Sequence, residues 1–191
     1  MIPFNHLGFI FNAFGSFVYP TSVRQSLCNF LVTLPKSAKV LDIGSGTGIL
    51  CEFGNKCRND LVYIAVDPAE GMMKYAKTYV ETHVAMAELL PFNTDSFDAL
   101  MMGESLHHLR DVDEALKECV RVLKNEGKLF IYDFELDSFM GKSICKGEKL
   151  LGEPGNFYVS QALKVKLEAY GFVVSITKHG WRYTIEAKLQ K

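Results

Sequence analysis

A glycine-rich turn placed directly after a short β-rich run constrains the fold of this chain more than any other feature. The run is KVLDI at residues 39–43, and the turn continues as GSGTG over residues 44–48. Glycines at alternate positions allow tight backbone turns and close approaches that a Cβ would prevent. A strand that ends in such a turn before a helix-like stretch is typical of a parallel sheet buried on both faces. We therefore expect an α/β fold that binds a ligand outside the carboxyl ends of its strands.

The rest of the chain alternates short apolar runs with helix-like stretches, without an internal repeat. Strands are expected at 39–43, 61–66, 81–86, 97–102 and 127–134, and helices at 21–33, 48–59, 69–79 and 111–124. A helix beginning at Ser160 and ended by Gly171 precedes two β-rich runs, at 172–177 and 183–189. Their short connection indicates a hairpin. The pattern predicts a Rossmann-like doubly wound sheet of seven strands, mostly parallel, with an antiparallel C-terminal hairpin strand.

Composition excludes several classes of function. The 21 Lys and Arg residues balance the 22 Asp and Glu residues, so no nucleic-acid partner is expected. The aromatic segment 2–20 is too short and too interrupted for a membrane span and lacks a basic signal-peptide region. None of the five cysteines is spaced as CxxC, so we expect reduced thiols, a cytoplasmic protein and no metal.

Two kinds of nucleoside ligand compete for the glycine turn. A dinucleotide fingerprint would have a third glycine where Ile49 stands, and its pyrophosphate would lie close to the turn. Asp42 would repel a pyrophosphate but suits a ligand whose near end is cationic, such as S-adenosylmethionine. Asp67, at the end of the second predicted strand, suits a ribose in either case. It could also act as the N-cap of the following helix.

Three segments of the chain resemble class I S-adenosylmethionine-dependent methyltransferases, in the branch that includes ubiquinone/menaquinone C-methyltransferases. These are VLDIGSGTG at 40–48, DPAEGMM at 67–73 and, less clearly, MAE before LPF at 86–92. The resemblance implies one methyltransferase domain over 1–191, with covering helices at 1–36, a cofactor-binding core at 37–136, a possible lid loop at 137–158 and a helix and hairpin at 159–191. It implies S-adenosyl-L-methionine bound by Asp42, Gly44, Ser45, Gly46, Gly48, Asp67, Pro68, Met72, Ala87, Glu88 and Gly103.

The third motif departs from the family at Met86, where an aspartate usually receives the adenine amino group. Either the backbone of Ala87 and the side chain of Glu88 share the adenine edge, or apolar contact holds the adenine. The implied acceptor is a small, partly apolar molecule, because the Asn/Asp-Pro-Pro-aromatic motif of enzymes that methylate DNA bases or glutamine is missing after the fourth strand. The acceptor and its accepting atom are not identified by the sequence, nor is the oligomeric state.

His107 is the candidate general base, since the pKa of a histidine can lie near the working pH, although a structural histidine is the alternative. Its neighbour His108 is expected to face elsewhere, without further ligands for a metal. The candidate acceptor-binding residues are Phe4, Phe11, Glu104 and Tyr132. Helical spacing of Phe4, Leu7, Phe11, Phe14 and Val18 predicts either a covering helix or a lid over a dry pocket. The opposing hypotheses are an NAD-dependent oxidoreductase and a non-catalytic relative that binds S-adenosylmethionine.

Overall fold

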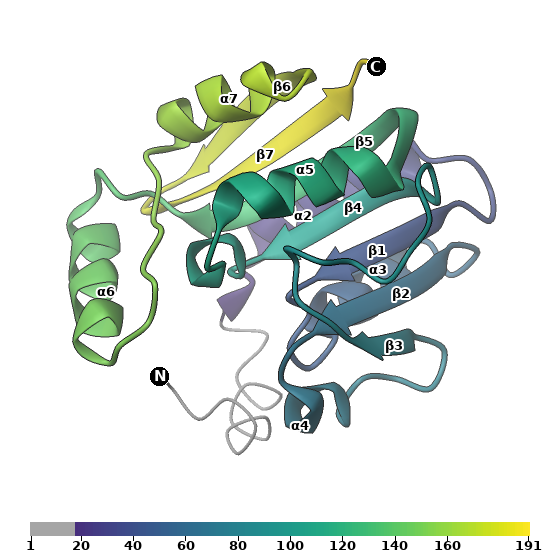
Figure 1. Cartoon of the computed structure of the whole chain (residues 1–191), viewed down its shortest axis with the longest axis horizontal. Coiled ribbons are helices and arrows are strands. Elements are labelled where there is room, and N and C mark those ends of the chain that lie inside the picture. Colours follow the sequence, from purple (N-terminus) through teal and green to yellow (C-terminus); the bar gives the residue numbers. More distant parts are fainter. Residues whose placement is uncertain (1–17) are drawn as a thin grey trace.

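The structure is a computed structural model in which residues 18–191 are described (Figure 1). A single seven-stranded sheet has the order β3-β2-β1-β4-β5-β7-β6. The strands are β1 Lys39–Ile43, β2 Val62–Asp67, β3 Glu81–Val84, β4 Phe97–Gly103, β5 Leu123–Phe134, β6 Phe172–His179 and β7 Arg182–Leu189. β1 to β5 pair in parallel, whereas β7 pairs antiparallel with both β5 and β6. The predicted doubly wound sheet with its antiparallel hairpin is confirmed.

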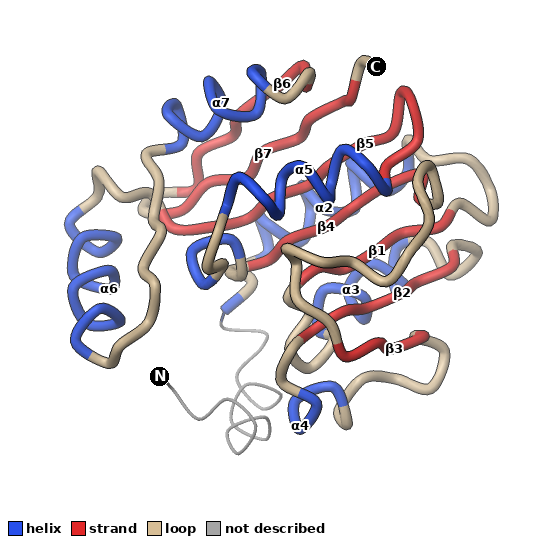
Figure 2. The backbone as a smooth tube through the Cα atoms, in the orientation of Figure 1, coloured by secondary structure: helices blue, strands red, loops and turns tan. Residues whose placement is uncertain are grey.

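Helices cover both faces of the sheet, as Figure 2 shows in blue over the red strands. They are α2 Thr21–Val32, α3 Ile49–Cys57, α4 Glu70–Met73, the short 3-10 helix η1 Leu106–His108, α5 Val112–Val122, α6 Phe139–Leu150 and α7 Ser160–Ala169. The apolar faces of α5 and α7 join one buried cluster, which includes Leu41 and Ile43 of β1. The helices α2 and α3 join the other, which includes Val40. Alternate residues of β1 therefore support opposite layers, as period-two packing requires.

Strand order reverses between β1 and β4, because β2 and β3 extend to one side of β1 and the remaining strands to the other. The carboxyl ends of the parallel strands meet there, which is where open α/β sheets bind ligands. The register pairs Asp42 with Ala65 of β2 and with Met101 of β4. The glycine turn that follows β1 is thereby held at the centre of this edge.

The expected lid loop at 137–158 is wrong over most of its length, because α6 occupies Phe139–Leu150. Ser138 caps this helix by accepting a hydrogen bond from the backbone N–H of Gly141. The sheet-covering layers do not include α6, which stands at the edge of the molecule in Figure 1. The predicted helix 69–79 and the strand 81–86 are also shorter in the structure, where α4 ends at Met73 and β3 at Val84.

The cysteines differ from expectation at one pair. Cys28 of α2 and Cys57 of α3 form a disulfide, with Cα atoms 5.6 Å apart, so the expectation of five reduced thiols is wrong for these two. Cys51, Cys119 and Cys145 are free and buried. Within residues 18–191, no helix is long and apolar enough to cross a membrane.

Candidate functional site

The turn after β1 is a backbone cradle built by three glycines in the left-handed region. The φ angles of Gly44, Gly46 and Gly48 are 68°, 54° and 74°. A Cβ on Gly44 would lie 2.5 Å from Cβ of Ser105, and one on Gly46 would lie 3.1 Å from Cε of Met72. Both the conformation and the space therefore require glycine at Gly44.

Asp67 connects the end of β2 to this turn. Its Oδ2 atom accepts a hydrogen bond from the backbone N–H of Gly46 at 2.8 Å, and its Oδ1 atom accepts one from Ala69 at 2.7 Å. Burial raises the pKa of this carboxyl group. A carboxylate oxygen has lone pairs for more than one donor, so these bonds leave capacity for ribose hydroxyls. α4 begins after Ala69 and has no side-chain cap, so Asp67 shapes the turn before the helix rather than serving as its N-cap.

Asp42 lies beneath the turn and is almost fully buried. Its Oδ2 atom accepts a hydrogen bond from Sγ of Cys51 at 3.4 Å. Asp42 forms no ion pair with a cationic side chain among residues 18–191. Burial raises its pKa to about 7. A carboxyl group with this pKa is partly protonated at neutral pH. A cationic ligand bound close to it would stabilise its ionised form. This electrostatic preference favours a cationic ligand head over a pyrophosphate.

The neighbouring residues form a largely apolar wall. Met72 is buried next to Gly46, Ala87 is buried in the core, and Pro68 is exposed at the turn before α4. Glu88 points elsewhere, because its Oε1 atom accepts hydrogen bonds from the backbone N–H groups of Arg110 and Asp111 at 2.8 and 3.1 Å. Of the two ways of holding adenine, this geometry supports apolar contact.

The end of β4 adds a second group of site residues. The hydroxyl of Tyr19 donates a hydrogen bond to the carbonyl of Gly103 at 3.0 Å, and a Cβ on Gly103 would lie 2.5 Å from the same hydroxyl. Glu104 has a positive φ of 50°, and its backbone N–H donates to the carbonyl of Tyr132 at 2.7 Å. A non-glycine residue in this region costs about 1–3 kcal/mol, so the surrounding contacts must hold the backbone of Glu104 in this conformation.

Arg182, at the start of β7, lies beside Glu104, a contact that the sequence analysis did not anticipate. One of its Nη atoms lies 3.2 Å from Oε1 of Glu104, and its guanidinium lies 3.9 Å from the ring centroid of Trp181. It also lies over the rings of Tyr132 and Phe134 at 5.6 and 5.4 Å. Among the described residues, Nε of Arg182 and Oε1 of Glu104 are buried without a hydrogen-bond partner.

The candidate acceptor-binding residues are only partly brought together. Burial raises the pKa of Glu104 to about 7, and Arg182 opposes that rise. Tyr132 is fully buried, and its hydroxyl donates a hydrogen bond to the carbonyl of Val18 at 2.8 Å. Its hydroxyl is therefore already used inside the protein. Phe4 and Phe11 lie outside the described residues.

His107 is buried and held between carboxylates. Its Nδ1 atom lies 2.6 Å from Oδ1 of Asp133, its Nε2 atom lies 3.6 Å from Oε1 of Glu148, and its ring stacks on Phe157 at 4.4 Å. Burial alone would lower the pKa of His107, but Asp133 and Glu148 raise it to about 10. A ring that is already protonated at neutral pH is a poor proton acceptor, so this geometry favours the structural alternative for His107.

His108 does not face away from its neighbour. The two imidazole rings lie 4.1 Å apart, and Nδ1 of His108 lies 4.0 Å from Glu148 and 3.7 Å from Glu153. The expectation that no further ligands converge on this pair is wrong, because the carboxylates of Glu148 in α6 and of Glu153 in the following loop both lie close to it. Burial, followed by the charge of His107, lowers the pKa of His108.

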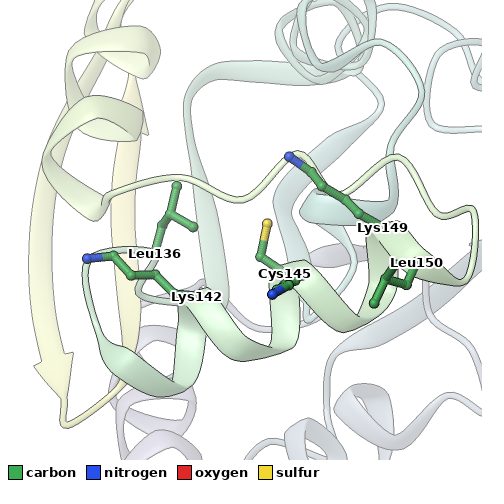
Figure 3. A pocket seen from close by; sticks show the side chains of 6 residues that line it. Leu136, Lys142, Cys145, Lys149 and Leu150 are labelled. Atoms are coloured by element: carbon green, nitrogen blue, oxygen red, sulfur yellow. The ribbon is translucent and has the colours of Figure 1, made fainter.

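A cavity of about 400 Å³ lies on α6, away from the glycine turn (Figure 3). Its lining consists of Leu136, Lys142, Cys145, Lys146, Lys149 and Leu150, none of which is a predicted site residue. The chemistry points instead to the strand ends, where the polar atoms of Asp42, Asp67 and Glu104 gather.

The residues at the strand ends fit S-adenosylmethionine. Besides the glycine cradle, Oγ of Ser45 is buried without a hydrogen-bond partner among residues 18–191, so a donor or acceptor of a bound ligand would satisfy it. Asp42 offers negative charge for the cationic methionine end, and Asp67 offers lone pairs for the ribose. The same set would repel a pyrophosphate at Asp42.

Comparison with known proteins agrees with this assignment. The model of the methyltransferase domain family matches residues 41–131. The ubiquinone/menaquinone biosynthesis C-methyltransferase UbiE of Campylobacter jejuni is 29% identical over 94% of this chain and 77% of its own length. An S-adenosylmethionine-dependent methyltransferase of Thermotoga maritima superposes with a TM-score of 0.76 at 23% identity, over 97% of each chain. One from Aquifex aeolicus superposes with a TM-score of 0.70 at 21% identity, over 93% of this chain and 97% of its own.

These findings support neither an oxidoreductase nor a non-catalytic relative. They agree with the seven-stranded, mostly parallel sheet. Residues 41–131 therefore match the methyltransferase domain family, and the whole chain is similar in sequence and fold to S-adenosylmethionine-dependent methyltransferases.

Proposed function

We propose that this enzyme methylates a small, partly apolar acceptor that carries an ionisable hydroxyl group, and that Glu104 and Arg182 bind that group. The observation that carries the proposal is the buried pair of Glu104 and Arg182, in which Oε1 of Glu104 lies 3.2 Å from an Nη atom of Arg182 and Nε of Arg182 has no hydrogen-bond partner among residues 18–191. Unsatisfied buried groups are costly, so they mark places where a ligand completes the network. One atom accepts and the other donates, as a hydroxyl group requires.

The surroundings of Arg182 support an aromatic or otherwise flat acceptor. The rings of Tyr132, Phe134 and Trp181 surround the guanidinium, and Phe134 and Trp181 are parallel within 4° at 5.7 Å. Such walls exclude water and favour flat apolar bodies. The UbiE relative, by its name, methylates carbon in quinone biosynthesis, and quinols are flat rings that carry hydroxyl groups.

Glu104 is better suited than His107 to accept the proton that the acceptor loses. Because the pKa of Glu104 is about 7, a substantial fraction of its carboxyl group is ionised at neutral pH. The same pKa makes the carboxylate more basic than an ordinary glutamate, as a general base requires. His107 is held as an imidazolium by Asp133, so we assign it a positioning role beneath the site.

Glu104 and Arg182 can together manage the proton and the negative charge that arise in the proposed methyl transfer. S-adenosylmethionine supplies an electrophilic methyl group on a positively charged sulfur. Glu104 takes a proton from the acceptor, and Arg182 stabilises the negative charge that remains on its oxygen. The nucleophilic atom of the acceptor would take the methyl group, and the sulfur would leave as a neutral thioether that keeps the electron pair of its bond to the methyl carbon. Positioning and exclusion of water supply much of the acceleration in such displacements.

The test uses the methyl-labelled cofactor with two panels of acceptors, hydroxylated aromatics and quinols in one and primary or secondary amines in the other. The expected result is transfer to the first panel. Glu104→Gln should lower kcat at least about 100-fold, the scale of a lost general base, and should remove an inflection near pH 7. Glu81→Gln, an exposed change in β3, is the control.

Transfer only to amines would contradict the proposal for the acceptor. An unchanged pH profile in Glu104→Gln would contradict the role of Glu104. Both results would leave the cofactor assignment intact.

Cytoplasmic location and the lack of a nucleic-acid partner belong to the same proposal. The balance of 21 basic against 22 acidic residues supports the second. The three free, buried cysteines support a cytoplasmic location, because such thiols are usual in a reducing compartment, whereas the Cys28–Cys57 disulfide speaks against it.

A further inference from the structure

A cluster of nitrogen and carboxylate ligands lies beside the methyl-transfer site, between η1 and α6. His107, His108 and Glu148 each offer a ligand atom, and these atoms lie within 4.8 Å of one another. η1 supplies both histidines and α6 supplies the glutamate. In Figure 1, α6 stands apart from the helices that cover the sheet.

We propose that His107, His108 and Glu148 bind one divalent transition-metal ion, with zinc as the best match. Two imidazoles and a carboxylate are a ligand set that zinc accepts, and Mg²⁺ and Ca²⁺ prefer oxygen ligands only. The arrangement supplies three protein ligands and leaves a fourth position for water or for Glu153.

The distances suit a tetrahedral ion. Bonds of about 2.0–2.2 Å place neighbouring ligand atoms about 3.3–3.6 Å apart at the corners of a tetrahedron. The Glu148 carboxylate lies 3.6 Å from Nε2 of His107 and 4.0 Å from Nδ1 of His108. Oε2 of Glu153 lies 3.7 Å from Nδ1 of His108. Because the three ligand atoms lie within 4.8 Å of one another, side-chain shifts of about 1 Å would close the site around a metal.

The second observation concerns the other ring nitrogen of His107. Its Nδ1 atom lies 2.6 Å from Oδ1 of Asp133, so a proton placed there directs the lone pair of Nε2 toward Glu148. Histidines that ligate metals usually donate their second N–H to a carboxylate in this way. Asp133 is itself fixed, because its Oδ1 atom also accepts the backbone N–H of Phe134.

The third observation is an unsatisfied atom on the glutamate. Oε2 of Glu148 is buried and has no hydrogen-bond partner among the described residues. Burying a carboxylate oxygen without a partner is unfavourable, and a bound cation would satisfy it. A divalent ion bound at Nε2 would displace the second ring proton that His107 carries in the metal-free protein, and with neutral imidazoles Glu148 and Glu153 would together balance the charge of the ion.

Such an ion would fasten α6 to the body of the enzyme. The apolar contacts beneath this helix come from a small cluster that includes Cys145, Phe134 and Phe157. A metal bridging η1 and α6 would add a strong link beside the end of β4. The site therefore has a structural consequence that can be measured without any methyl acceptor.

The test is a calorimetric titration of the purified, metal-free full chain with zinc chloride. The expected result is about one ion bound per chain, a raised Tm, and slower tryptic cleavage at Lys142, Lys146 and Lys149 of α6. Glu148→Gln and His108→Ala should each weaken zinc binding at least about tenfold. Glu81→Gln, which alters the exposed Glu81–His83 pair, should leave it unchanged.

Cobalt(II) provides an independent readout of ligand type. A tetrahedral visible spectrum without a thiolate charge-transfer band is expected, because the ligands are nitrogen and oxygen. Near-ultraviolet circular dichroism establishes that each variant is folded, and the conservative Glu148→Gln change keeps the test decisive if His108→Ala fails to fold. Absence of zinc binding, a thiolate band, or equal affinity in folded Glu148→Gln would overturn the proposal in favour of a metal-free imidazolium network.

Discussion

The carboxylate of Asp67 accepts a hydrogen bond from the backbone N–H of Gly46 at 2.8 Å, which joins the end of β2 to the centre of the glycine turn. This bond fixes the turn and places an acid beneath the expected ribose at the same time. We therefore expect both ligand binding and the order of the turn to depend on the side chain of Asp67.

Asp67→Ala should raise the dissociation constant of S-adenosylhomocysteine at least tenfold, the effect of losing about 1.4 kcal/mol. The variant loses both the ribose contact and the bond that orders the turn. Isothermal titration calorimetry measures the change. Asp98→Asn is the matched control, because Asp98 also accepts a backbone N–H, from Lys39 at 2.8 Å, but lies at the start of β4 on the opposite edge. Unchanged affinity in folded Asp67→Ala would refute the ribose assignment.

Asp42 should make cofactor affinity depend on pH. Its pKa of about 7 means that the carboxyl group is protonated, and no longer attracts a cation, as pH falls through that value. S-adenosylhomocysteine and S-adenosylmethionine should therefore both bind more weakly at pH 5.5 than at pH 7.5, and the sulfonium should show the larger effect. In Asp42→Asn, titrations at the two pH values should give nearly equal affinities. A wild-type affinity that is independent of pH would contradict this role.

The same substitution should stabilise the protein without its cofactor. The folded state holds the pKa of Asp42 above the ordinary value of 3.8, so it binds this proton more tightly than the unfolded chain does. Its stability is therefore lost as pH rises from about 4 to 7, and the loss persists above that range. Asp42→Asn should raise the free energy of unfolding at pH 8 by about 1–3 kcal/mol, less than the full shift would give. Urea denaturation at pH 4 and pH 8 measures the difference, and a destabilised variant at pH 8 would argue against it.

Gly44→Ala should destabilise the fold through two effects. The positive φ costs about 1–2 kcal/mol, and contact with Ser105 adds about 1–3 kcal/mol. Gly180→Ala separates the effects, because Gly180 has a φ of 67° but nothing within 4 Å of the added Cβ. Denaturant melts should give the smaller loss for Gly180→Ala. Equal losses in the two variants would show that crowding at Ser105 is unimportant.

The position of the candidate cofactor-binding residues at the strand ends was largely predictable from the sequence, whereas their role in binding stays a prediction. Glycine spacing, Asp42 and the acid that ends β2 are local signals, since each lies within or directly after one strand. The structure places Gly44, Gly46 and Asp67 together at the strand ends because parallel strands bring their carboxyl ends to one edge. Glu88 departs from its expected place, because backbone donors from Arg110 and Asp111 bind its carboxylate.

The contact between Arg182 and Glu104 and the proposed metal-ligand cluster were not predictable, although Glu104 was itself a candidate from the sequence. Arg182 meets Glu104 only because β7 inserts between β5 and β6, and nothing local marks that pairing. The helix α6 was missed because Gly141 and Gly147 weaken helix propensity, although Ser138 offered a capping signal. With α6 read as a loop, the approach of Glu148 to His107 could not be anticipated.

The most direct test of the account is a calorimetric titration of the wild-type chain with S-adenosylhomocysteine and, separately, with NAD at neutral pH. The account predicts binding of about one S-adenosylhomocysteine per chain and no detectable heat of binding for NAD, because Asp42 lies where a pyrophosphate would approach. Saturable binding of NAD together with indifference to S-adenosylhomocysteine would contradict it.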